Sequence, residues 1–141
     1  MTTSTDRRRS VEDIEGDRWG DPPADATYLI RTVLLLRRTP VGELGVEDLR
    51  ILLGQRVAPS VLVPLALEVL LEDPLAAGHF YPGDLLKSVL GQPGSFWDGH
   101  PGPLADLTVV LDRFQAVLEA ADPDEVPPRD LLRAVREFRE R

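Results

Sequence analysis

The stretch HFYPGDLL, residues 79 to 86, holds the residue types that could do chemistry. A histidine beside a carboxylate can act as a general base with its orienting group, and His79 with Asp84 would be such a pair. His100 with Asp98 would be a second. Neither pair comes with an evident nucleophile, and the phosphate-binding and nucleophile-elbow motifs GxxxxGK[ST], GxGxxG and GxSxG do not occur. We therefore expect no catalytic residue, and a small hydrolase using His79 or His100 is kept as an alternative.

Metal and cofactor sites find little support in the residue types of the chain. There is no cysteine, so thiolate ligands and disulfides are excluded. The two histidines lie 21 residues apart and lack the HExxH spacing of a zinc site. We expect no metal and no cofactor.

The same stretch also has a purely structural interpretation. Pro82 and Gly83 suit the middle of a type II turn, in which glycine takes the positive φ. Asp84 would then cap the helix that follows. Phe80 would pack inward, and Tyr81 would present its hydroxyl outward. The segment is thus predicted to be a corner between two helices, at which Tyr81 could also touch a partner.

Apolar residues repeat with helical spacing along most of the chain, and no segment alternates with a period of two over a strand's length. The sequence predicts an all-α fold, a compact single-domain bundle of about six helices. Residues 61–71 would be its central helix, with Ser60 as N-cap and Pro64 at the fourth helical position. The helices 25–37, which we expect to be largely buried, and 104–120 would pack on it. The remaining predictions are helices at 46–53, 84–90 and 128–139 and a loop at 91–103.

A length of 141 residues suits one domain with a core of its own. We expect a disordered basic tail over residues 1–10, with Arg7, Arg8 and Arg9, and a single α-helical domain over 11–141. The first ten residues lack the apolar run of a signal peptide, and no apolar run is long enough to span a bilayer. A cytoplasmic location is the simplest expectation.

Charge is the strongest indication about partners. The net charge of -8 disfavours nucleic acid or an anionic membrane as the direct partner, whereas it would speed encounter with a basic protein. Acidic residues are densest between 11 and 25, around Trp19, which could be a lid over the bundle or an exposed interface anchor. A second acidic group lies toward the C-terminus, at Glu119, Asp122, Asp124 and Glu125. Phe96 and Trp97 are expected to plug one end of the bundle.

Four segments occur in a recognisable order between about residues 11 and 101: EGDRWGDPPADATYLIRT, VEDLRILLGQ, LVPLALEVLLEDPLAAGHFYPGDLLKSVL and FWDGHP. Together they resemble a family of immunity proteins from contact-dependent growth-inhibition (CDI) systems. FYPGDLL and the VEDLR-to-GQ segment are the most specific of these marks. The motifs carry no known catalytic role, so the resemblance transfers none.

The resemblance implies a small cytosolic α-helical protein that binds and neutralises a toxin delivered by a neighbouring cell. Such toxins are commonly nucleases, and part of this family pairs with an RNase A-like toxin domain. An acidic inhibitor can occupy the active site of a nuclease by mimicking its polyanionic substrate. A helical protein–protein adaptor or regulatory domain is the alternative. The residues expected to bind the toxin are Glu12, Asp13, Glu15, Asp17, Trp19, Asp21, Asp25 and Tyr81.

Overall fold

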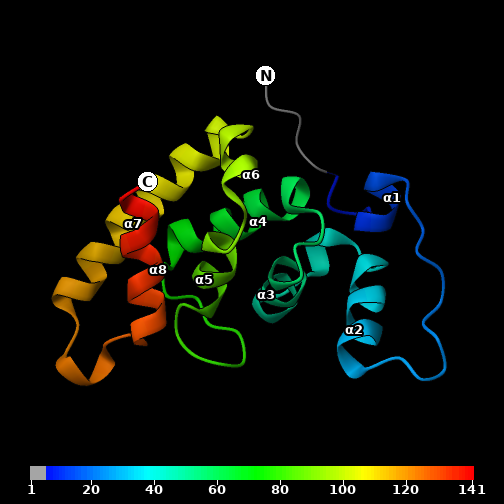
Figure 1. Cartoon of the computed structure of the whole chain (residues 1–141), viewed down its shortest axis with the longest axis horizontal. Helices are drawn as coiled ribbons and strands as arrows, with labels where there is room; N and C mark the ends of the chain where they lie inside the picture. The colour runs from blue at the N-terminus through cyan, green and yellow to red at the C-terminus, as the bar shows by residue number, and fades with distance from the viewer. Residues whose placement is uncertain (1–5) are drawn as a thin grey trace.

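A computed structural model describes residues 6–141, and within them the fold is all-α, as predicted (Figure 1). Six of its helices have seven residues or more, in agreement with the predicted number. Instead of strands, these residues contain two isolated β-bridges, Ser10 with Pro40 and Ala77 with Pro82. The α-helices are α1 (Val11–Glu15), α2 (Tyr28–Arg37), α3 (Val46–Gly54), α4 (Pro59–Glu72), α5 (Asp84–Leu90), α6 (Gly94–Asp98), α7 (Pro101–Ala120) and α8 (Arg129–Arg139), with 3-10 turns η1 (Val41–Glu43) and η2 (Pro123–Glu125).

Helix α4 is the central element, as expected from its apolar sequence. It packs on α3, α5 and α7, and its residues Leu62, Val63, Ala66, Leu67 and Leu70 are buried. Its start differs from the prediction, because Ala58 rather than Ser60 is the N-cap. Pro64 therefore lies inside the helix and not at its fourth position. A proline in a helix interior removes one intrahelical hydrogen bond.

The prediction that residues 25–37 form a largely buried helix packed on the central helix is wrong for α2. This helix packs on α3 at one end of the molecule (Figure 1). Its buried residues are Val33, Leu36 and Arg37, while Tyr28 is 83% exposed and Leu29, Ile30 and Leu35 are exposed too. The apolar residues go most of the way round the helix, but a helix at the end of a bundle has a neighbour to cover one side only.

The segment 91–103 is not the continuous loop that its glycines and prolines suggested. It contains α6, and α7 begins at Pro101. Proline is tolerated in the first turn of a helix, where its missing N–H has no intrahelical partner to lose. Phe96 and Trp97 on α6 are buried in an edge-to-face pair, and Trp97 meets Phe138 of α8 in the same way. The prediction that they plug one end of the bundle is confirmed.

The predicted basic tail is described from residue 6 onward, and residues 1–5 lie outside the described part. The carbonyls of Arg7 and Arg9 accept hydrogen bonds from the N–H groups of Gly42 and Val41. Ser10 caps α1, and its side chain accepts a hydrogen bond from the N–H of Asp13. Residues 7–10 thus lie along the start of η1, while the single domain over 11–141 stays a prediction.

The two acidic groups of the sequence lie far apart. Helices α1 and α2 are at one end of the molecule, α7 and α8 are at the other, and α3, α4 and α5 lie between them (Figure 1). The acids of 11–25 belong to the first end and those of 119–125 to the second. Across residues 6–141, no helix combines the length and the apolar character needed to cross a membrane.

Candidate functional site

The corner at residues 78–84 contains the predicted type II turn. The carbonyl of Tyr81 accepts a hydrogen bond from the N–H of Asp84 (3.0 Å), and Gly83 has φ 93° and ψ 2°. A side chain at position 83 would also force Leu131 to move, since a Cβ there would lie 2.4 Å from Cδ2 of Leu131. This turn joins the segment after α4 to α5.

Asp84 does not cap α5 as predicted, because Gly83 occupies the N-cap position. The Asp84 side chain is 3% exposed and turns back toward the preceding loop. Its carboxylate accepts hydrogen bonds from the backbone N–H groups of Gly78 (2.6 Å) and Phe80 (3.1 Å), and Nε of Arg50 lies 3.8 Å away. Asp84 is therefore the anchor of the loop, with a nearby cation to offset its buried charge.

His79 and Asp84 do not form the catalytic pair that their proximity in sequence allowed. The His79 side chain is 78% exposed, and its Nδ1 lies 3.4 Å from a carboxylate oxygen of Glu47. Glu47 also accepts two hydrogen bonds from Arg50, at 2.5 and 2.6 Å. Arg50 is the main reason that the pKa of Glu47 is lowered from 4.5 to about 2. His79 therefore faces an ion pair of α3, and Asp84 is engaged elsewhere.

His100 and Asp98 do not pair either. Nδ1 of His100 lies 2.7 Å from the carbonyl oxygen of Phe96, Nε2 lies 3.2 Å from Oγ of Ser60, and the ring stacks on Phe96. Asp98 instead approaches Arg141 (3.8 Å). Sequence reasoning missed the contact with Ser60, which lies 40 residues away. Ser60 is in the first turn of α4 and His100 precedes α7, so the contact joins the starts of two helices.

The described part of the chain contains no evident metal site. Among residues 6–141 there is no group of three or more Asp, Glu or His side chains placed to hold an ion. The sequence contributes no cysteine to such a group.

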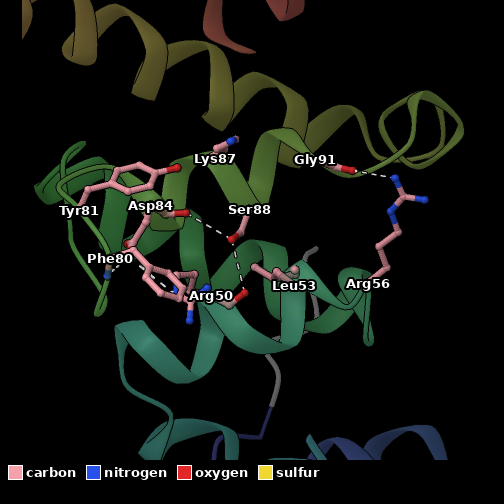
Figure 2. Close-up of a pocket in the computed structure, with 10 residues that line it drawn as sticks. Arg50, Leu53, Arg56, Phe80, Tyr81, Asp84, Lys87, Ser88 and Gly91 are labelled. Carbon is pink, nitrogen blue, oxygen red and sulfur yellow. Dashed lines mark hydrogen bonds and ion pairs between the residues drawn. The ribbon is translucent and has the colours of Figure 1, made fainter. Parts of the chain in front are cut away.

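Phe80 does not pack inward as predicted. Phe80 is 71% exposed and rests on the guanidinium of Arg50, 4.2 Å from its ring centroid, whereas Tyr81 is half-buried against the core. The flat guanidinium offers the outer aromatic ring a packing surface, so burial in the core is unnecessary. Figure 2 shows the two rings on either side of Asp84. Burial also raises the pKa of the Tyr81 hydroxyl.

The corner forms one side of a groove of about 300 Å³ between α3 and α5 (Figure 2). Three cationic side chains line it, those of Arg50, Arg56 and Lys87, against one carboxylate, that of the buried Asp84. Phe80 and Tyr81 complete the wall at the corner. Its positive lining is suited to an acidic group of a partner rather than to a basic one.

A second arrangement, at the other side of α3, centres on Arg37. This arginine at the end of α2 has a side chain only 1% exposed. Its Nη2 donates to a carboxylate oxygen of Glu15 (3.2 Å) and to the carbonyl of Asp17 (2.9 Å). Its guanidinium lies 3.8 Å from the ring centroid of Trp19. The indole N–H of Trp19 donates to the Asp17 carboxylate (3.0 Å), although the residue as a whole is 51% exposed.

Arg37 is a functional candidate that sequence reasoning did not identify. The available signal was a charged residue one helical turn after Val33, on the face of α2 that is buried. A buried arginine requires polar or acidic partners, and the acid-rich segment 11–25 supplies them here through Glu15 and Asp17. Part of the acidic segment therefore serves to satisfy one buried cation, Arg37.

The remaining predicted acids divide into paired and unpaired residues. Arg38 pairs with Asp21 (3.0 Å) and lies 3.8 Å from Glu12. Asp13 and Asp25 are exposed and make no ion pair with any described residue. The structure thus gathers the predicted acids and Trp19 at one end of the molecule. It places Tyr81 apart from them, in the groove between α3 and α5.

A comparison with protein families gives one match to the chain. The sequence profile of the CDI immunity proteins matches residues 13–107, from the acidic segment to the first half of α7. This range includes Trp19, Arg37 and the corner at 78–84, whereas α8 lies beyond it. No curated protein and no solved structure matches the chain.

Proposed function

The chain belongs to the CDI immunity proteins, and from this premise we propose that it neutralises a nuclease toxin, an RNase, by occluding the toxin's active site. Membership of the family itself makes the chain an immunity protein and its partner a cognate CDI toxin. The chemistry of the toxin and the mode of inhibition are the proposed part. An inhibitor of this kind needs no catalytic group of its own.

The observation that carries the proposal is the acidic end of the molecule around Trp19. A nuclease binds phosphates with Lys, Arg and His side chains, so its active site attracts a surface of clustered carboxylates. The net charge of -8 supports association with such a partner. Asp13 and Asp25 are exposed and free of intrachain ion pairs among residues 6–141, so they are available to basic groups of a toxin.

The proposed toxin-binding residues are those predicted from the sequence: Glu12, Asp13, Glu15, Asp17, Trp19, Asp21 and Asp25, with Tyr81 as a separate contact. The groove beside Tyr81 is lined by Arg50, Arg56 and Lys87, which would repel the basic active site of a nuclease. Charge complementarity therefore favours the end with Trp19 as the surface that covers the active site.

The direct test is protection of a cell. The cognate CDI toxin domain is expressed alone and together with this chain, and survival and RNA integrity are followed. We expect the chain to restore growth and to stop RNA degradation. A matched variant, His79→Ala, should protect equally well, since a non-catalytic inhibitor has no need of that histidine. Absence of rescue would overturn the proposal and favour the adaptor alternative. Loss of protection in His79→Ala would favour the hydrolase.

A further inference from the structure

We infer that an apolar groove beside Trp19 is the anchor site for the toxin, and that it receives one apolar side chain flanked by basic residues. This inference rests on the proposed function, and it names the contact within the acidic end. The groove has a volume of about 240 Å³ and lies between the Trp19 loop, α2 and the turn from α3 to α4. Leu29, Ile30 and Leu34 line it from α2, and Gln55 and Val57 line it from the turn.

The groove exposes apolar surface that the fold leaves uncovered. Trp19 and Ile30 are 51% and 46% exposed, and Leu29 is exposed as well. Contiguous apolar surface on a soluble protein commonly marks an interaction site. A volume of about 240 Å³ falls below the range of about 300–1,000 Å³ that is usual for small-molecule sites. A single side chain of a protein partner suits this space better than a metabolite does.

The wall formed by Trp19 is ordered before any partner arrives. Arg37 covers one face of the indole ring, and Asp17 accepts its N–H. An aromatic side chain held in place loses little conformational entropy on binding, which is the property of residues that dominate interface energetics. Trp19 therefore combines exposure with a fixed orientation.

The opposite wall is formed by a strained turn. Val57, which lines the groove, is flanked by Arg56 and Ala58, and both have positive φ values (56° and 44°). Residues other than glycine adopt this conformation at an energetic cost, and such strain concentrates at sites where function requires a particular backbone shape. The turn thus holds Val57 and Gln55 in place as the second wall.

Charge identifies the flanking groups of the occupant. Glu15 and Asp17 lie beside the aromatic wall, both in contact with Arg37. An apolar side chain that enters the groove from a basic surface would bring its Lys or Arg neighbours to these acids. This is the arrangement of an apolar anchor within a polar, charge-complementary rim. The nuclease toxin that we propose as the partner would present such a basic surface.

The test measures binding of the purified, catalytically inactivated toxin domain by calorimetry. Ile30→Glu places a charge in the groove and should weaken binding by about 100-fold, as expected for an anchor in an interface. The matched control is Val109→Glu on α7, at a residue of similar exposure (43%) remote from the groove, which should leave the Kd unchanged. A second variant, Gln55→Arg, adds a cation at the other wall and should weaken binding by about tenfold. It keeps the test valid if Ile30→Glu fails to fold.

Each outcome decides a separate point. If the wild-type chain does not bind the toxin, the proposed function falls, and the inference falls with it. If the wild type binds and the groove variants bind equally well, the groove inference alone is overturned. The same conclusion follows if Val109→Glu weakens binding as much as Ile30→Glu does. If the free chain is a dimer in sedimentation and Ile30→Glu makes it a monomer, a second copy occupies the groove and the toxin assignment is wrong.

Discussion

The guanidinium of Arg37 lies 3.8 Å from the ring centroid of Trp19 and at the same time donates hydrogen bonds to Glu15 and Asp17. One buried cation thereby orders an aromatic ring and two acidic residues from a segment rich in glycine and proline. The order of the acidic end, and with it the proposed toxin surface, depends on this arginine.

Replacing Arg37 by methionine should release Trp19 and destabilise the fold. The variant loses a cation–π contact and two charge-assisted hydrogen bonds, so we expect a loss of about 2 kcal/mol in the free energy of unfolding. In a Trp97→Phe background, where Trp19 is the single tryptophan, acrylamide should quench its fluorescence more strongly in the variant. Arg38→Met is the control, since Arg38 is partly exposed, and its effect should stay below about 1 kcal/mol. Equal quenching with and without Arg37 would contradict this interpretation.

Asp84→Ala should be among the most damaging substitutions at the corner. The change leaves the N–H groups of Gly78 and Phe80 without their acceptor, and we expect a loss of about 3 kcal/mol in the free energy of unfolding. His79→Ala, at the exposed neighbouring position, should change stability by less than about 0.5 kcal/mol. Denaturant titration of both variants measures the difference. Similar stabilities of the two would show that Asp84 is not the anchor of the loop.

The ion pair of Glu47 with Arg50 should make stability depend on pH in the acid range. Because the pKa of Glu47 is about 2 in the folded chain and 4.5 ordinarily, its contribution is complete above pH 4.5 and is lost as the pH falls through 2. The free energy of unfolding of Glu47→Gln should lie about 2 kcal/mol below that of the wild type at pH 7. The gap between the two proteins should narrow steadily between pH 4.5 and pH 2. A gap that stays constant over this range would refute the assignment.

Charge reversal distinguishes the two acidic ends of the molecule. Asp13→Lys with Asp25→Lys should slow toxin association by about tenfold at low ionic strength and reduce its salt dependence, because rim charges act mainly on the association rate. Both residues are exposed, so helical content should not change. The matched pair, Asp122→Lys with Asp124→Lys at the far end, should leave the rate nearly unaffected. Stopped-flow kinetics supplies the comparison, and the reverse result would move the interface to the C-terminal end.

The sequence predicted the parts of the fold that depend on local pattern. Helical spacing located α4, α5, α7 and α8, and the Pro82-Gly83 pair indicated its turn correctly. Burial was harder to predict, because the apolar residues of α2 show which faces can be covered, not which neighbours are present. The prolines at 101 and 103 looked like loop residues, although they occupy the first turn of α7, where the backbone N–H is not needed.

The candidate site was predictable in composition but not in arrangement. The density of acids around Trp19 is visible in the sequence, and it marks the same end of the molecule in the structure. Their partner Arg37 lies 18 residues after Trp19 and is brought to it only by the return of the chain along α2. The orientation of Phe80 depends likewise on Arg50, which belongs to another segment of the chain. Contacts of this kind leave no spacing pattern from which to predict them.

Titration of the purified toxin domain with the purified chain tests the central claim most directly. RNA cleavage by a fixed amount of toxin is measured as the chain is added, and the complex is quantified in the same samples. Neutralisation by occlusion of the active site predicts that cleavage falls linearly and reaches zero at one chain per toxin domain. A complex that forms fully while cleavage continues, or the absence of any complex at micromolar concentrations, would contradict the claim.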